Sequence, residues 1–327
     1  QFGILILAIK RTNTNLLDLG KDALAQLENL YRKGTELVNA DESLRSEARA
    51  ELVKLQQGDQ ENLEIWKTVN QVSLQSFQEV YDLLDVRFDE TMGESYFRDK
   101  VDSIYDALVA NEICEESEGA LVVFHPEHKR FAKQPFIIRK SDGASNYATT
   151  DLATLRHRSE EMDANKIVYV TDGRQQDHFE QLFLTAGKWY ASEKKILPDL
   201  KHVWFGTILG EDNKAIKTRE GQPIKLLDLL GESVSRARSI VENKNPNLEE
   251  EEKTKLSEAV GVGAVRYADL SQDRTLDYVF SWEKLLALQG NTAPYLQYAV
   301  TRIRSIFRKL ELNLGEGEDD ASPPETE

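Results

Sequence analysis

Two short β-rich runs separated by one amphipathic stretch place the strongest constraint on the fold of this chain. The runs are Lys166–Val170 and His202–Gly206, and the helical stretch between them is Asp177–Ser192. Strand–helix–strand alternation is typical of neighbouring parallel strands joined by a crossover helix. The sequence therefore predicts an α/β domain with a parallel sheet. Two earlier runs, Ala120–Phe124 and Phe136–Arg139, flank a proline-containing loop and could form a hairpin.

Helical periodicity dominates on both sides of the α/β region. Residues 14–88 keep apolar side chains at three–four spacing, with a turn at Gly58-Asp59 between the second and third helices. The preceding apolar run, Phe2–Ile9, indicates a short buried strand or a helix end, and the strand is favoured. Three later helices are predicted over Ile224–Val241, Glu249–Tyr267 and Ala293–Leu310. Asn247 is the expected N-cap of the second of them.

Four segments follow from these patterns. The expected boundaries are a helical segment at 1–88, the α/β segment at 89–241, a helical segment at 242–312, and a Gly-, Pro- and Glu-rich tail at 313–327 that we expect to be disordered. The chain opens at Gln1 within an apolar run, which we interpret as a cut point.

Composition narrows the class of protein. Of the 327 residues, 40% are hydrophobic and 30% charged, as in an ordinary globular protein, and no apolar run approaches the roughly 20 residues that span a bilayer. One cysteine and five histidines predict no disulfide and no zinc site. We therefore expect a cytoplasmic protein that binds neither a membrane nor zinc. We also expect it to be a monomer. The net charge of −16 disfavours nucleic-acid binding, although a local basic patch is enough for it.

The stretch Tyr147-Ala148-Thr149-Thr150-Asp151 follows a turn at Ser141-Asp142-Gly143. If a helix starts at Asp151, Tyr147 and Asp151 lie beside each other at its mouth. They could form a cation site, in which a carboxylate meets a bidentate partner beside an aromatic ring. The alternative is simple helix capping by Thr150 or Asp151.

Other motifs favour the cation site. Gly93-Glu94-Ser95 stands near the start of the α/β segment. Gln175-Gln176-Asp177-His178 follows the strand at 166–170, where residues past the carboxyl end line a ligand crevice. With Tyr-x-x-x-Asp, these Gly-Glu-Ser and Gln-x-x-His elements stand in the order and at about the spacing of arginyl-tRNA synthetases. The chain resembles that family from Gln1 to about Lys309.

The resemblance implies the second half of a class I, Rossmann-like catalytic domain with a helical insertion, followed by the all-α start of an anticodon-binding domain. It implies that Glu94, Tyr147 and Asp151 face the substrate guanidinium and that Gln175 lies near its ammonium group. It also places His178 at the ATP site. Paired carboxylates match a planar guanidinium better than they match lysine.

A second element, Phe205–Gly210 followed by Lys217–Gly221, resembles the family's version of the mobile KMSKS loop. It implies that Gly206, Lys217, Thr218 and Arg219 bind ATP, which brings Mg²⁺ with it, and that Lys217 and Arg219 are catalytic because they stabilise the triphosphate. Arg219 and Ala215 replace the two lysines of the general motif. The alternative for this element alone is a basic surface hairpin.

The third element begins at Gly290-Asn291-Thr292-Ala293-Pro294 and resembles the entry to the anticodon-binding domain. Thr292 or Asn291 can cap the following helix, and Pro294 suits its first turn. Arg304 and Arg308 share a helix face at i, i+4 and could meet tRNA phosphates, or they could simply be solvated.

The family function implied for the parent protein is ATP-dependent attachment of L-arginine to tRNA through an arginyl-adenylate. The family's HIGH motif would lie before residue 1, and no His-x-Gly-His occurs here. We therefore expect this chain alone to be inactive. Two alternatives remain: a non-catalytic truncated binding module, and a class I synthetase of another specificity, against which the two carboxylates argue.

Overall fold

The computed structural model describes residues 1–327 except 21–22, 144–145, 211, 213, 215–223 and 311–327. The chain divides into two compact units, Gln1–Arg87 and Phe88–Glu327. The KMSKS-like residues Lys217, Thr218 and Arg219 and the tail at 313–327 lie outside the described residues. Nothing in the described part is a helix long and apolar enough to cross a membrane.

The first unit is helical. It consists of α1 (Phe2–Thr12), the 3-10 turn η1 (Leu16–Asp18), α2 (Ala23–Ala40), α3 (Glu42–Gln56) and α4 (Gln60–Leu83). Gly58 has a φ of +86°, so the turn predicted at Gly58-Asp59 is confirmed, and the Asp59 side chain caps α4.

The apolar N-terminal run is a helix, and the strand favoured from the sequence is wrong. Residues from Leu5 to Ile9 are buried on every side of α1, so the run carries no helical periodicity that would distinguish it from a buried strand. Leu5 and Ile9 pack with Leu27 and Val69 of the neighbouring helices. At Gly3 a Cβ would lie 2.1 Å from the Ala48 carbonyl oxygen, which shows how closely α1 and α3 cross.

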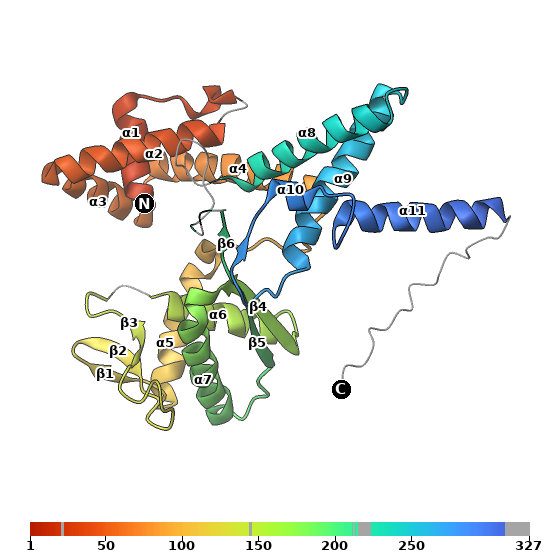
Figure 1. Cartoon of the computed structure of the whole chain (residues 1–327). Coiled ribbons are helices and arrows are strands. Elements are labelled where there is room, and N and C mark those ends of the chain that lie inside the picture. The colour runs from red at the N-terminus through yellow and green to blue at the C-terminus, as the bar shows by residue number, and fades with distance from the viewer. Residues whose placement is uncertain (21–22, 144–145, 211, 213, 215–223, 311–327) are drawn as a thin grey trace. The chain divides into compact units, whose positions relative to one another are not determined.

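The second unit contains the α/β part of the chain (Figure 1). The elements that build it come in the following order: η3 (Glu94–Lys100), α5 (Val101–Ala110), β1 (Glu115–Ser117), β2 (Ala120–Val123), β3 (Phe136–Arg139), α6 (Tyr147–Glu160), β4 (Lys166–Asp172), η4 (Gly173–Gln175), α7 (Gln176–Ser192), β5 (Asp199–Phe205) and β6 (Ile208–Leu209). The predicted hairpin is confirmed, because β2 pairs antiparallel with β3, and β1 adds a third strand.

The predicted parallel pair is also confirmed. β4 and β5 run parallel in one continuous register, from Lys166 opposite Asp199 to Asp172 opposite Phe205, and α7 connects them. The core below this pair holds fully buried side chains such as Leu152 of α6, Leu182 of α7 and Ile138 of β3. Burial of large apolar side chains at about 25 cal/mol per Å² is what fixes these helices against the strands.

The remaining elements are mostly helical: α8 (Leu226–Lys244), α9 (Glu250–Leu270), β7 (Tyr278–Val279), α10 (Trp282–Leu285) and α11 (Ala293–Lys309). Glu249, not Asn247, occupies the N-cap of α9; the predicted cap at Asn247 is wrong because that residue lies in the preceding turn. At Gly261 a Cβ would lie 2.6 Å from the Cα of Val234, so α8 and α9 cross in close contact.

The cap predicted for α11 is confirmed. The Thr292 hydroxyl accepts a hydrogen bond from the backbone N–H of Tyr295 at 3.3 Å, and Pro294 stands in the first turn. The strand β7 pairs in parallel with β6, which brings residues after α9 back to the carboxyl end of β5.

Candidate functional site

Helix α6 begins at Tyr147, four residues before the start at Asp151 that was considered from the sequence. Its N-cap is Asn146, whose side-chain oxygen accepts from the backbone N–H of Tyr147 at 2.9 Å. Capping by Thr150 or Asp151, and a helix start at Asp151, are therefore wrong. Tyr147 opens the helix and Asp151 lies one turn later, so the two side chains share a face, as the cation site requires.

Strand β3 holds this helix start in place. The Asn146 amide donates to the Ile137 carbonyl at 3.0 Å, and the buried Thr149 hydroxyl donates to the Ile138 carbonyl at 2.5 Å. Both residues are parts of the site that the sequence analysis missed. Asparagine is a preferred N-cap residue, so the sequence did contain a signal for the cap at Asn146. The hydrogen bond of Thr149 has no such signal, because its partner lies on strand β3.

The Asp151 carboxylate meets His178 from the first turn of α7. Asp151 Oδ2 and His178 Nε2 lie 2.6 Å apart, and the two side chains are 32% and 27% exposed. The structure thus joins two residues that the sequence placed in different subsites, arginine and ATP. Tyr147, one turn before Asp151 on α6, has its side chain exposed to solvent.

Gln175 lies at the carboxyl end of β4, as predicted. It ends η4 and precedes α7, and it is exposed. The adjacent Asp172 caps η4 by accepting from the backbone N–H of Arg174 at 2.8 Å and from the Arg174 guanidinium. The hydrogen bonds from Arg174 lower the pKa of Asp172. Because Asp172 pairs opposite Phe205, Gln175 and Gly206 follow the same edge of the parallel pair.

Glu94 is the first residue of η3 and is exposed. Its neighbours Tyr96 and Phe97 stack edge-on against His157 of α6, and Lys100 pairs with Glu161 at 3.0 Å. These contacts attach η3 to the second half of α6. In the described part of the chain, no hydrogen bond or ion pair joins Glu94 to Tyr147 or Asp151. The expected convergence of the three side chains on one guanidinium stays a prediction.

Gly206 has a structural reason to be glycine. A Cβ there would lie 2.4 Å from the Leu276 carbonyl oxygen, and the Gly206 N–H donates to the Arg274 carbonyl at 2.8 Å. Asp277 accepts from the backbone N–H of Thr207 at 2.6 Å. The segment from Arg274 to Asp277, which no sequence pattern indicated, therefore clamps the chain where it leaves β5.

A second histidine, His202, lies on strand β5 of the parallel pair. His202 Nε2 is 2.8 Å from the Thr171 hydroxyl, and its ring packs on Phe179 at 4.5 Å between centroids. Burial lowers the pKa of His202, and the neighbouring His178 and Arg274 lower it further. This environment favours the neutral imidazole near neutral pH.

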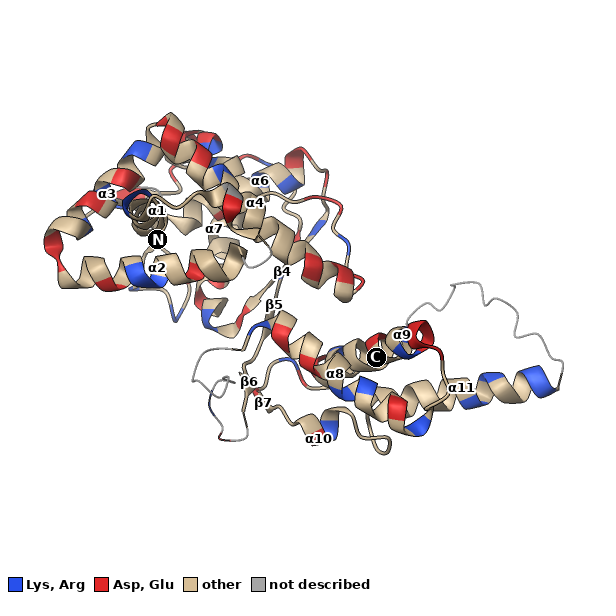
Figure 2. Ribbon diagram, turned by 90° about the horizontal axis from the view of Figure 1, so that it is seen from above, with Lys and Arg blue, Asp and Glu red and all other residues tan. Residues whose placement is uncertain are grey.

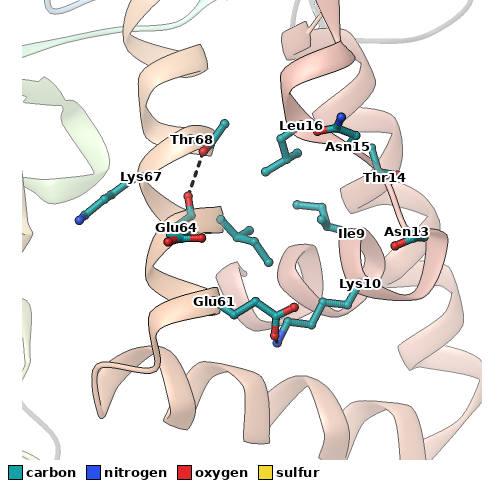
Figure 3. Close-up of a pocket in the computed structure, with 11 residues that line it drawn as sticks. Ile9, Lys10, Asn13, Thr14, Asn15, Leu16, Glu61, Glu64, Lys67 and Thr68 are labelled. Atoms are coloured by element: carbon teal, nitrogen blue, oxygen red, sulfur yellow. Dashed lines mark hydrogen bonds and ion pairs between the residues drawn. The ribbon is translucent and has the colours of Figure 1, made fainter.

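The first unit contains an open groove, drawn in Figure 3, of about 500 Å³. Lys10 and Glu61 form an ion pair of 2.7 Å at one end, and Thr68 donates to the Glu64 carbonyl. None of the site residues predicted from the sequence lines it. Elsewhere, no set of three or more His, Cys, Asp and Glu side chains in the described ranges is arranged to hold a metal ion.

The chain is similar to known proteins of one family over most of its length. Residues 1–282 match the family model described as tRNA synthetases class I (R), catalytic domain. The chain is 43% identical to an arginine–tRNA ligase of Fusobacterium nucleatum over 324 residues, which cover 98% of this chain and 55% of that protein. It is 42% identical to arginine–tRNA ligases of Klebsiella pneumoniae and Escherichia coli, covering 96% of this chain and 54% of each.

Solved structures agree. Arginyl-tRNA synthetase from Plasmodium falciparum superposes with a TM-score of 0.76 at 28% identity, over 96% of this chain and 50% of that one. The Thermus thermophilus enzyme gives a TM-score of 0.70 at 20% identity over 94% of this chain and 56% of that one, which supports the fold. The chain spans about half the length of the curated relatives it matches. With a family model matching most of its length, the chain belongs to the class I tRNA synthetase family, in the (R), or arginyl, branch of the catalytic domain.

Proposed function

We propose that this chain is part of a cytoplasmic, monomeric arginine–tRNA ligase that joins L-arginine to tRNA at the expense of ATP. The observation that carries the proposal is the placement of Tyr147 and Asp151 on one face of α6, where Asp151 contacts His178 of the helix that follows β4. A carboxylate at the rim of a parallel pair is where a cationic substrate group would meet its partner.

The proposed arginine subsite uses the residues that the family resemblance assigned. Asp151, Tyr147 and Glu94 would face the guanidinium, and Gln175 the ammonium group. The guanidinium is planar and always charged, and its fork of N–H donors matches carboxylate oxygens. A lysine ammonium offers a point charge without that geometry, so this set of residues favours arginine.

In the proposed reaction the arginine carboxylate attacks the α-phosphorus of ATP and pyrophosphate leaves. A ribose hydroxyl of the tRNA then attacks the arginyl-adenylate and takes the arginyl group, and AMP leaves. Gly206, Lys217, Thr218 and Arg219 are proposed to hold ATP, with the two cations stabilising the triphosphate. Mg²⁺ is proposed to arrive bound to the phosphates of ATP. The chain's contribution is to position the reactants and stabilise charge.

Titration of amino acids into the full-length protein tests the substrate. We expect L-arginine to bind with measurable heat in isothermal titration calorimetry and L-lysine and L-leucine to bind at least tenfold more weakly. Asp151→Asn should weaken arginine binding by tenfold or more, since it removes a charged partner of the guanidinium. Asp106→Asn, an exposed residue of α5 with the same charge change, is the matched control.

Three results would each overturn the proposal. The first is tighter binding of lysine or leucine than arginine, which would point to another synthetase specificity. The second is equal loss of arginine affinity in Asp151→Asn and Asp106→Asn. The third is arginine binding without arginine-dependent ATP–pyrophosphate exchange in the presence of tRNA, which would favour a non-catalytic binding module.

A further inference from the structure

The contact between His178 and Asp151 joins two helices across 27 residues of sequence. Asp151 stands in the second turn of α6 and His178 in the first turn of α7, and α6 packs beside α7 below the parallel pair. At 2.6 Å between Nε2 and Oδ2, the distance is that of a short hydrogen bond to a carboxylate.

Buried aromatic rings fix the orientation of the histidine. The His178 ring is tilted against Phe136 of β3 at 5.6 Å and meets Phe179 edge-on at 5.2 Å. Both phenylalanines are buried, with 5% and 4% of their surface exposed. The imidazole cannot swing away from Asp151 without losing contact with side chains that belong to the core.

The carboxylate keeps binding capacity on its solvent side. His178 contacts Oδ2, and no other residue of the described chain forms a hydrogen bond or ion pair with either oxygen of Asp151. An ionised carboxylate offers about four acceptor positions. Because His178 occupies one lone pair of Oδ2, the other lone pair of Oδ2 and both lone pairs of Oδ1 can accept from donors that approach from the side of Tyr147.

We propose that His178 is a positioning residue of the arginine subsite: it donates from Nε2 to Asp151 and holds the carboxylate in the orientation that receives the guanidinium. This role rests on the proposed function and replaces the ATP contact expected for His178 from the sequence. A carboxylate already fixed in its rotamer loses less side-chain freedom when arginine binds, so the hydrogen bond improves affinity without touching the substrate.

Two substitutions distinguish the effect of the hydrogen-bond donor from the effect of the volume of the imidazole ring. His178→Leu fills the space between the phenylalanines but has no donor, whereas in His178→Gln the side-chain amide reaches about as far as Nε2. His128→Leu is the control, because His128 is also partly exposed and also meets a carboxylate, Glu180 at 3.1 Å, but lies on the loop between β2 and β3.

The readout is ATP–pyrophosphate exchange by the full-length protein in the presence of tRNA, with the concentrations of arginine and ATP varied in turn. We expect His178→Leu to raise KM for arginine about tenfold or more, as for the loss of a hydrogen bond to a charged group, with KM for ATP changed less than about twofold. For His178→Gln, the KM for arginine should stay within about threefold of the wild-type value. For His128→Leu, it should equal the wild-type value. A rise in KM for ATP alone, or equal defects in both His178 variants, would refute the positioning role.

A second measurement does not depend on activity. In wild-type protein at pH 8, long-range ¹H–¹⁵N spectra should show the His178 proton on Nε2. Asp151→Asn should move that proton upfield, because a neutral amide oxygen accepts a weaker hydrogen bond than a carboxylate does. An unchanged spectrum would contradict the proposed contact. Wild-type protein that activates no arginine would refute the proposed function, while the spectra would still decide whether His178 holds Asp151.

Discussion

The carbonyl oxygen of Leu276 occupies the space where a side chain at position 206 would begin. A Cβ built on Gly206 would lie 2.4 Å from that oxygen and 2.6 Å from its carbon. Residues 70 positions apart are held at this distance by Asp277, which accepts from the Thr207 N–H. The backbone that leaves β5 is therefore fixed by a segment that follows α9.

Substitution of Gly206 by alanine should displace this clamp. Because the clashing atoms are backbone, we expect Gly206→Ala to lower the free energy of unfolding by about 1–3 kcal/mol, as in other overpacked sites. Denaturant-induced unfolding followed by circular dichroism measures the loss. Gly187→Ala on α7 is the control: its Cβ would meet nothing within 4 Å, and alanine there should stabilise the helix by up to about 1 kcal/mol. Equal stability of the two variants would disprove the clamp.

Removal of the α6 cap should affect both stability and the site. Asn146→Ala loses the bond to the Tyr147 N–H and the bond to the Ile137 carbonyl, at a cost of about 1–2 kcal/mol in unfolding free energy. Since Tyr147 and Asp151 follow directly, we also expect weaker binding of arginine by calorimetry. Asp41→Ala removes a comparable cap from α3 in the other unit and should destabilise without changing arginine affinity. An equal loss of affinity in both variants would show that the effect is general.

The stability of the first unit should depend on pH through Glu51. Burial by itself would raise the pKa of this carboxyl, but hydrogen bonds from Lys54, Lys10 and Asn62 outweigh it and lower the pKa from 4.5 to about 2. A depressed folded-state pKa means that the carboxylate stabilises the fold above pH 4.5 and that this contribution is lost as pH falls toward 2.

Glu51→Gln should therefore cost about 2–3 kcal/mol at pH 7, and the difference from wild type should shrink below pH 4.5. Unfolding monitored by circular dichroism from pH 7 to pH 3 provides the test. Glu47→Gln is the control, because Glu47 is half exposed and, among the residues that the structure describes, forms an ion pair only with Arg11. A pH-independent difference between Glu51→Gln and wild type would mean that packing, not charge, is responsible.

The basic end of α11, visible in Figure 2, should bind tRNA through one face. Arg304 and Arg308 are exposed and one turn apart. We expect the double substitution to alanine to weaken tRNA binding and to reduce the slope of log affinity against log salt by about 1.4–1.8, the value for two phosphate contacts. Fluorescence anisotropy with labelled tRNA at several salt concentrations measures both effects.

Arg302 is the control for this face, since it is also exposed on α11 but points about 200° away from Arg304 around the helix. Arg302→Ala should leave the salt dependence close to wild type. A reduction of the slope by Arg302→Ala as large as that of each single substitution at 304 or 308 would indicate a general charge effect instead of a binding face.

Sequence periodicity was sufficient for elements whose pattern is local. The parallel pair β4 and β5 and the crossover α7 were predicted because strands and amphipathic helices repeat apolar residues at their own spacing. The turn at Gly58 was predicted because Gly-Asp is itself a local turn signal. The failure at α1 has the same origin: a run buried on all sides has no polar face to reveal its period.

The sequence by itself determined the family and the residue types of the candidate site, because Tyr147, Asp151 and Gln175 stand in short motifs read along the chain. Only the tertiary structure decided what those residues touch. The meeting of His178 with Asp151 and the clamp of Gly206 by Leu276 depend on how helices and strands far apart in sequence pack. Such contacts arise from burial and backbone approach across elements, and no local spacing encodes them.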